Sequence, residues 1–265
     1  MRVLLPLLLA AFAPQAAPEQ RIPAAEAHQG VAAGVRFVYA IDNAQIGKYD
    51  RKTGRRVAHW QGDRAHFKHM NSCALVGREL VCAASNYPDT PHVSMVERFD
   101  ADRLRHLGTV PLPGFPGSLT VLDWHDGHWW AVFANYDGRG GVAGRDHRAT
   151  LVVQLDRRFR EVRRFTFPPE VLARFAPHSC SGGAWKGGLF YVSGHDRPEL
   201  YAMRVPTSGT VLELVATYPM ATEGQAVDWD PVLPDTLWSI ERKTGEMVAA
   251  PINLRAPKSG SHGNH

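Results

Sequence analysis

The sequence predicts an all-β protein, and in particular a five-bladed β-propeller. Short apolar stretches separated by turn residues fill most of the 265-residue chain, and almost none of them has a helical period. A unit of strands recurs five times, with a step of roughly 50 residues. Four antiparallel strands repeated at such a step are typical of propeller blades, each of which buries its faces only against its neighbours.

Three strands can be placed in every unit from its apolar stretches and turns. The first strands cover residues 30–33, 71–76, 118–124, 178–185 and 224–230. The second strands, each of which ends in a polar cluster, cover residues 37–43, 80–87, 130–137, 189–196 and 237–242. The third strands cover residues 45–49, 94–99, 149–155, 199–205 and 246–252. In the first three units an aspartate ends this strand and begins the turn to a fourth strand.

The fifth unit has no obvious outer strand of its own. Residues 21–25 can supply one, which would close the ring with both ends of the chain. However, ERKTGEMV at 241–248 resembles DRKTGRRV at 50–57, where the turn joins the third and fourth strands of a blade. A fifth unit shifted by one strand would change the blade count, so a six-bladed ring with one degenerate blade and a β-sandwich remain as alternatives. Only residues 168–175 predict a helical turn, with proline at its start.

The first 20 residues have the pattern of a secretory signal peptide. Arg2 precedes an apolar stretch at 3–13, which is too short to span the ~30 Å bilayer core as a helix. The cleavage site is left open, because Pro14 or Pro18 would follow the small residues that favour cleavage. We therefore expect a periplasmic or secreted protein with its propeller at 21–256, a disordered tail at 257–265 and no association with membranes.

The formal net charge of +4 comes mostly from arginine, and part of it is local. Between residues 157 and 164 arginines alternate with apolar residues, which is typical of the solvated face of an outer strand. We therefore expect no nucleic-acid partner. The expected partner is a small molecule, and the expected state is a monomer.

The three cysteines allow at most one disulfide within the chain, and their spacing matches no zinc-binding pattern. Cys73 and Cys82 fall in adjacent strands of one predicted hairpin, and Cys180 falls two blades away. The channel should separate Cys180 from Cys73, so we predict that Cys180 is a free thiol. Cys73 has two interpretations: a nucleophile beside His69 or His178, or, as we favour, a small buried apolar residue.

Polar and titratable residues recur at one step of the repeat. In a blade, the start of the first strand and the end of the second lie side by side at one mouth of the channel. The starts precede the ends by 17 or 18 residues, in the pairs His69 and Asn86, Ser118 and Asn135, His178 and His195, and Glu223 and Glu241. Turn chemistry explains polar strand ends in general, but not the recurrence of histidine and glutamate. We therefore predict a functional site at this mouth, with Asn43, Asn86, Asn135, His195 and Glu241 on one face.

The residue types at the mouth indicate three roles. Proton transfer is assigned to Glu223, His178 and His195. Contacts with a small polar ligand are assigned to Asn43, Tyr87, Asn135, Tyr136 and Arg242. One divalent cation, Ca²⁺, Mn²⁺ or Zn²⁺, is expected as the only cofactor, with the ligands His69, Asn86, Asp196 and Glu241. On this interpretation the isosteric change Glu223→Gln should preserve the fold and abolish metal or ligand binding.

A glycine-rich segment, GRGGVAG at 138–144, follows the second strand of the third unit. It opens no helix, so it lacks the context of a phosphate-binding loop. We expect a long flexible loop over the mouth, with Asp146, His147 and Arg148 at its far end.

The segments HMNSC, SNYP, ANYDG, GHDRPELY and EGQAVDWD resemble those of exported bacterial propeller proteins, some of which carry the label cycloisomerase. The resemblance covers residues 37–252 and implies a propeller, but no established catalytic residues. The architecture is also similar to gluconolactonase-type propellers, in which Glu, Asn and Asp hold one divalent metal in the channel. Only those residue types agree here. Plant-type glutaminyl cyclases are similar in length, export and blade count, but their EGWG-type motif is absent from this sequence.

Two functions from different classes follow. One is a metal-assisted lactone hydrolase or isomerase that acts on a small polar substrate at the channel mouth. The other is a non-catalytic propeller that binds a glycan, a peptide or a partner protein. An ion held next to an open water position would favour the enzyme, and a dry, closed site would favour the scaffold.

Overall fold

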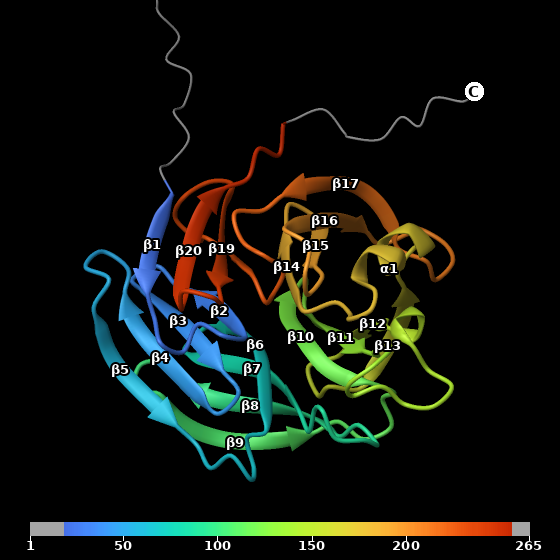
Figure 1. Ribbon diagram of the computed structural model, residues 1–265, viewed down its shortest axis with the longest axis horizontal. Helices are drawn as coiled ribbons and strands as arrows, with labels where there is room; N and C mark the ends of the chain where they lie inside the picture. The colour runs from blue at the N-terminus through green and yellow to red at the C-terminus, as the bar shows by residue number, and fades with distance from the viewer. Residues whose placement is uncertain (1–18, 256–265) are drawn as a thin grey trace, which may run out of the picture.

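The computed structural model describes residues 19–255 and shows five four-stranded antiparallel sheets arranged as blades around a central channel (Figure 1). The prediction of a five-bladed β-propeller is confirmed.

In the first four blades the strands follow one another outward in chain order. Blade one contains β2 (Gly30–Ala33), β3 (Phe37–Asp42), β4 (Gln45–Asp50) and β5 (Arg56–Gln61), and blade two contains β6 (His69–Val76), β7 (Glu79–Ser85), β8 (Ser94–Asp100) and β9 (Arg105–Pro111). Blade three contains β10 (Ser118–His125), β11 (His128–Ala134), β12 (Leu151–Leu155) and β13 (Glu161–Thr166), and blade four contains β14 (Gly182–Lys186), β15 (Leu189–Ser193), β16 (Glu199–Arg204) and β17 (Glu213–Pro219).

The fifth blade is assembled from both ends of the described chain. β18 (Asp228–Trp229) lies innermost, followed by β19 (Thr236–Glu241), β20 (Glu246–Pro251) and β1 (Gln20–Pro23). β1 runs antiparallel to β20, with Ile22 opposite Met247 and both side chains buried. The outer strand expected near residues 21–25 is therefore present. The turn after Glu241 joins the second and third strands of the blade, so the shift by one strand does not occur.

The turn between the third and fourth strands is built in the same way in three blades. Oδ1 of Asp50 accepts hydrogen bonds from the backbone N–H groups of residues 52 and 53, at 3.1 and 3.0 Å. Asp100 accepts from residues 102 and 103, and Asp156 accepts from residues 158 and 160. Each aspartate satisfies two donors that the turn removes from the sheet, which explains the aspartate in the repeat.

Apolar side chains fill the space between neighbouring blades, and polar side chains join their innermost strands. The large buried residues include Phe99, Phe133, Tyr201 and Trp238. Oδ2 of Asp123 in blade three accepts from the backbone N–H of residue 185 in blade four, at 2.8 Å. Asp228 in blade five accepts from the N–H of residue 33 in blade one, also at 2.8 Å. The second contact crosses the closure of the ring, so the two ends of the repeat are joined at the channel as well as at the rim.

Two innermost strands are shorter than the sequence suggests. β14 begins at Gly182 rather than at residue 178, and β18 contains only Asp228–Trp229 rather than 224–230. Before β18 the backbone turns to the next blade, because the N–H of Ala226 donates to the carbonyl of Gln29. His178 and Glu223 therefore lie on loops and not at strand starts.

The described residues contain two short helices, α1 (Pro169–Phe175) and the 3₁₀ helix η1 (His147–Ala149). α1 confirms the helical turn expected at 168–175, with proline in its first turn. Within residues 19–255, no helix has the length and apolar composition needed to cross a bilayer. Apart from Glu19 and Gln20, the predicted signal peptide at 1–20 lies outside the described residues, as does the predicted tail at 257–265.

A disulfide between Cys73 and Cys82 joins β6 to β7 at directly opposed positions. The hypothesis of a nucleophilic Cys73 is therefore wrong, since a disulfide sulfur is not a thiolate. Cys180 is a free and fully buried thiol, as predicted. Disulfides persist mainly in oxidising compartments outside the cytoplasm, which is consistent with export.

Thiol titration tests this pairing. Without reductant, we expect one reactive thiol per denatured chain and none in the native protein, because Cys180 is fully buried and burial raises the pKa of its thiol. Denaturation with reductant should raise the count to all three cysteines. A reactive thiol in the native protein, or three thiols without reductant, would contradict the assignment.

Candidate functional site

A cavity of about 680 Å³ opens at one mouth of the channel. Its volume lies within the range of small-molecule sites, about 300–1,000 Å³. Seven of the twelve residues singled out in the sequence line it, namely Asn43, His69, Tyr87, Tyr136, His178, His195 and Arg242. They meet because the second strands of all blades end at this face and the connections to the first strands pass beside them.

The innermost strands narrow the channel below the cavity. In the amide orientation that satisfies its polar atoms, Asn71 of β6 donates to the backbone carbonyls of Thr120 and Ser181, at 3.1 and 3.0 Å. This side chain therefore links blades two, three and four. Gly30 of blade one lies so close to blade five that a Cβ atom on it would come within 2.5 Å of the Cβ atom of Ala226. Glycine is required there, because any larger residue would push the two blades apart.

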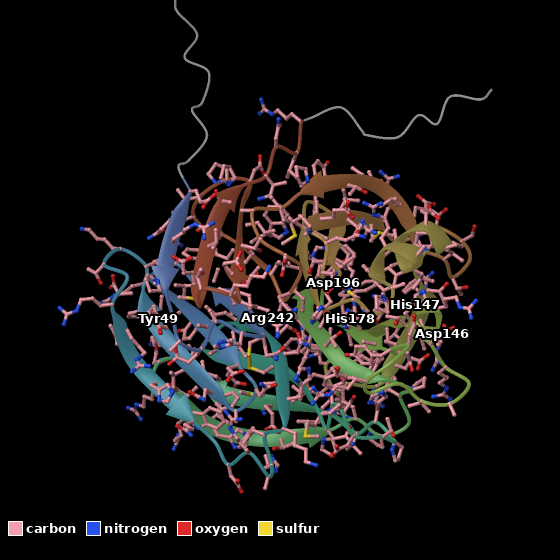
Figure 2. All side chains as sticks on the ribbon, in the orientation of Figure 1. Tyr49, Asp146, His147, His178, Asp196 and Arg242 are labelled. Carbon is pink, nitrogen blue, oxygen red and sulfur yellow. A yellow bond between two sulfur atoms is a disulfide. The ribbon has the colours of Figure 1, made fainter. Side chains whose placement is uncertain are left out.

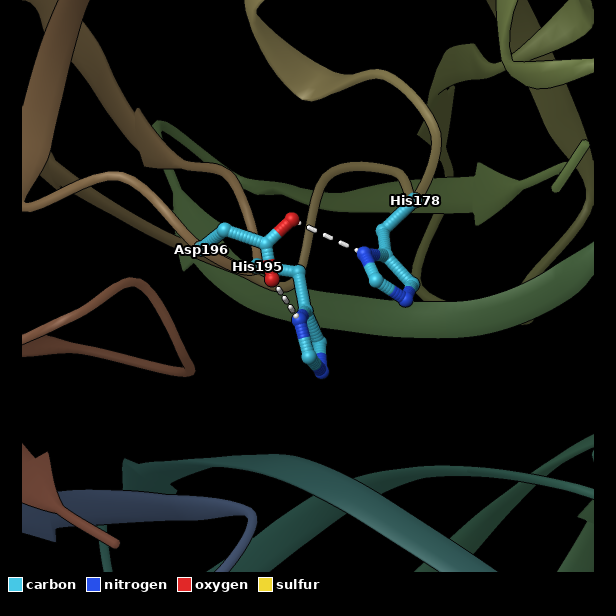
Figure 3. Close-up of side chains that lie close together, drawn as sticks. All are labelled: His178, His195 and Asp196. Carbon is cyan, nitrogen blue, oxygen red and sulfur yellow. Dashed lines mark hydrogen bonds and ion pairs between the residues drawn. The ribbon is translucent and has the colours of Figure 1, made fainter.

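One carboxylate orients two histidines at the mouth (Figure 3). Oδ2 of Asp196 lies 2.8 Å from Nδ1 of His178, and Oδ1 lies 2.7 Å from Nδ1 of His195. The two imidazole rings are stacked, with their centroids 4.2 Å apart. Because a carboxylate only accepts, each Nδ1 donates, and each Nε2 is left to exchange a proton. Figure 3 shows that the Nε2 atom of each histidine lies on the side of its imidazole ring that faces away from Asp196.

Arg242 follows β19 and lies near the centre of the ring, close to His178 and Asp196 in the view of Figure 2. Its Nη1 lies 3.2 Å from Nε2 of His195. A guanidinium only donates, so this nitrogen accepts and His195 is neutral. Burial lowers the pKa of His195, and the charges of His178 and Arg242 add to this effect, while Asp196 opposes it.

His69 is the second neutral histidine of the cavity. Its Nδ1 lies 2.8 Å from Oδ1 of Asn43, which therefore fixes the tautomer with a proton on Nδ1. Burial lowers the pKa of His69 to about 4, and the positive charge of Arg242 contributes to the shift. The same guanidinium thus acts on histidines from two blades.

The cavity carries an excess of positive charge. Four cations line it, Arg64, Lys68, Arg139 and Arg242, against one lining carboxylate, Asp89, which lies 2.6 Å from Nζ of Lys68. Asp196 behind the histidines is a second carboxylate. Four cations against two carboxylates leave an excess of two positive charges while the histidines are neutral. Within residues 19–255, the three arginines form no ion pair with a carboxylate, so their charges are available to a ligand.

Aromatic rings form one wall of the cavity, and the glycine-rich loop rests on it. The Tyr87 ring packs between His69 and Tyr136, with centroid distances of 5.0 and 4.9 Å. A Cβ atom at Gly140, whose φ is +78°, would lie 2.4 Å from the Tyr87 ring. The loop therefore needs glycine to approach the wall, and this approach brings Arg139 to the cavity.

The remaining predicted residues lie at the same mouth but outside the cavity lining. The Asn86 amide donates to the carbonyl of residue 91 and accepts from the N–H of residue 93, so it holds its own loop. Asn135 is buried and donates to the carbonyls of residues 116 and 149. Oε1 of Glu223 lies 2.7 Å from Nζ of Lys243, and Glu241 accepts from the backbone N–H of Lys243. None of these four side chains faces the ligand space, so we leave them out of the proposed site.

The expected metal ligands do not form one set. Asn86 and Glu241 lie outside the cavity, and Nδ1 of His69 is engaged by Asn43. His178, His195 and Asp196 do place nitrogen and oxygen atoms within 4.8 Å of one another. Both oxygens of that carboxylate already accept from imidazoles, and the surrounding cations oppose a further positive ion. These residues fit a divalent cation poorly.

A second cluster with metal-ligating atoms lies in the loop between β11 and β12. Oδ1 of Asp137 accepts from Nδ1 of His147 at 2.6 Å, and Asp146 lies nearby. The Asp146 carboxylate accepts from the N–H, Nε and Nη2 of Arg148. These contacts satisfy the cluster internally, and we interpret them as the fastening of the loop.

Several lining residues were missed in the sequence analysis. Arg64 and Lys68 lie on the connection from blade one to blade two, and Arg139 lies within the glycine-rich loop; none of these segments repeats. Gln225 is 2% exposed and lines the cavity, and among residues 19–255 its Nε2 has no hydrogen-bond partner. Its only signal was its place in the segment EGQAVDWD.

Comparison with known proteins supports the fold. The sequence matches no protein-family model and no curated protein. Among solved structures, a glutaminyl cyclase from Myxococcus xanthus has a TM-score of 0.56 at 9% identity, over 88% of this chain and 94% of that chain. The computationally designed Ika8 protein (TM-score 0.39, 10% identity, 83% of this chain and 57% of that chain) and a chain of the mitotic checkpoint complex (0.43, 14%, 95% and 88%) are less similar. At 9% identity the first likeness shows the propeller fold alone, so the activity has to be argued from the site.

The burial of His69 predicts acid sensitivity. Its folded-state pKa of about 4 lies below its ordinary value of 6.5, so its contribution to the free energy of unfolding is complete above pH 6.5 and is lost as the pH falls towards 4. The full loss is on the order of 3 kcal/mol. Urea unfolding between pH 7.5 and 4.5 should therefore show a shallower decline for His69→Gln than for the wild type. His128→Gln is the control, because His128 begins β11 at the end of that strand away from the mouth. Equal declines in the wild type and His69→Gln would refute the assignment.

Proposed function

We propose that this protein binds a small anionic molecule in the mouth cavity and that His178, oriented by Asp196, exchanges a proton with it. The observation that carries the proposal is the pairing of two imidazole Nδ1 atoms with one carboxylate in a cavity with an excess of two positive charges. A base needs a fixed tautomer and a lone pair aimed at the ligand, which the carboxylate provides. Unpaired arginines provide the charge that holds an anion.

Hydrolysis of a lactone that carries a carboxylate is the reaction that we propose first. Nε2 of His178 takes a proton from water, and the water oxygen adds to the lactone carbonyl carbon. When the ring carbon–oxygen bond breaks, the imidazolium returns the proton to the leaving oxygen, so one lactone and one water give one hydroxy acid. Asp196 stabilises the imidazolium formed in between. Burial raises the pKa of Tyr136, so its hydroxyl stays protonated and can donate to the carbonyl oxygen.

Isomerisation is the second reaction that the same groups support. It requires a proton to leave one atom of the substrate and another to arrive at a neighbouring atom. His178 and His195 lie side by side on one carboxylate, so two bases face one ligand. Nε2 of His195 accepts from Arg242 in the free protein. A ligand carboxylate that draws Arg242 away would release this nitrogen for proton transfer.

Export is part of the proposal. The disulfide between Cys73 and Cys82 and the pattern of residues 1–20 support a periplasmic or secreted location. A small anionic substrate would therefore be met outside the cytoplasm.

Single substitutions test the assignment of the base. On a panel of carboxylated lactones, followed by acid release, we expect His178→Gln to lower kcat by about 10²–10⁴ with little change in KM. Asp196→Asn should lower kcat by at least about tenfold, because the imidazoles lose the carboxylate that orients them. Glu223→Gln is the matched control: it removes a carboxylate at the same mouth but outside the cavity, and it should leave the kinetics unchanged.

Three outcomes would count against the proposal. Full activity of His178→Gln would exclude this residue as the base. A loss of activity in Glu223→Gln alone would move the chemistry to the connection between blades four and five. Tight ligand binding without turnover in every assay would favour the non-catalytic propeller.

A further inference from the structure

We propose that the natural ligand carries two separated anionic groups, one held by Arg242 and the other by Arg139, and that it is a small dicarboxylate. This inference rests on the proposed anion site and names its class of ligand, which includes the hydroxy dicarboxylate that hydrolysis of a carboxylated lactone releases. It follows from where the unpaired arginines are attached and from the total charge of the cavity.

Arg242 forms the first anion position. It follows β19 in blade five, and its Nη1 lies 3.2 Å from Nε2 of His195 in blade four. Its guanidinium has five N–H donors, and one acceptor nitrogen satisfies only one of them. A carboxylate that binds it bidentately would lie next to both histidines, where proton transfer is proposed.

Arg139 forms the second anion position. It belongs to the loop between β11 and β12 of blade three, which is not adjacent to blade five in the ring. The contact of Gly140 with the Tyr87 ring holds this loop against the wall formed by blade two. Asp137 and His147 fasten the other end of the loop, with 2.6 Å between Oδ1 and Nδ1. Arg139 and Arg242 therefore approach the cavity from different sides, and one planar carboxylate cannot bind both bidentately.

The charge of the cavity also favours a ligand with two negative charges. Four lining cations face two carboxylates, and Arg64, from the connection between blades one and two, adds to the charge on the rim. A monoanion would leave one positive charge uncompensated in a partly enclosed space. A dianion would neutralise the excess, which is the condition for tight and specific binding.

A matched series of ligands tests this proposal in the full-length protein. Glutarate, its monomethyl ester and its dimethyl ester have the same carbon chain with two, one and no charges. By calorimetric titration we expect glutarate to bind at least about tenfold more tightly than the monoester, and the diester not to bind measurably. Inorganic phosphate concentrates its charge on one group and should bind more weakly than glutarate. Affinity for glutarate should fall more steeply with added NaCl than affinity for the monoester.

Variants assign the two positions. Arg139→Gln should reduce glutarate affinity to the level of the monoester and change monoester affinity little, because one carboxylate can still bind Arg242. Arg145→Gln, on the same loop but outside the mouth cavity, is the control and should match the wild type. If Arg139→Gln unfolds, as judged by thermal melting, Arg64→Gln provides a second measurement and should bind glutarate more weakly than the wild type does.

The outcomes separate the two levels of the account. Equal affinities for glutarate and its monoester, or tighter binding of phosphate, would overturn the dicarboxylate assignment while leaving an anion site. Absence of binding by every anion would overturn the anion site and this inference with it. An unchanged glutarate affinity in both Arg139→Gln and Arg64→Gln would overturn the second position.

Discussion

β1 lies along β20, and this pairing makes a single sheet from the two ends of the described chain. Each blade is a narrow sheet whose faces are covered only by its neighbours, so the cores between blades are complete only when the ring is closed. Closure of the ring also positions the residues of the candidate site. Gly30 of blade one approaches Ala226 of blade five, and Asp228 accepts from the backbone of blade one at the same junction. Without this closure Arg242, after β19, and His69, at the start of β6, would not face a common space.

The electrostatic arrangement at the mouth depends on the contact of one carboxylate, that of Asp196, with two histidines. Asp196 fixes the tautomers of His178 and His195 together, and its single negative charge is shared between them. Burial and the charge of Arg242 keep His195 and His69 neutral. Anion binding would change this balance, because a carboxylate would compete with Nε2 of His195 for Arg242. Binding and proton transfer are thus linked through one side chain.

Most of the fold could be predicted from the repeat, because the strand period, the turn aspartates and the step between units are local properties of the sequence. It also brought His178, His195, Arg242 and Tyr87 to one mouth, because each lies at the end of a second strand or just before a first strand. Glu223 was misplaced for a physical reason: the backbone before β18 pairs with Gln29 of the next blade, and the side chain pairs with a lysine. Arg64 and Arg139 could not be found from the repeat, because loop residues reach the cavity only through tertiary contacts. The rim cations also oppose a divalent cation among the His, Asn, Asp and Glu residues whose composition suggested a metal site.

The most direct test of the account is to locate an anion in the mouth by diffraction. Crystals soaked in bromosuccinate would give an anomalous bromine signal and density for two carboxylates. The account predicts the bromine inside the cavity, with one carboxylate on Arg242 beside His195 and the other towards Arg139. Bromine at any other place on the propeller, with the mouth unchanged at a saturating concentration, would contradict the claim that the closed ring builds an anion site.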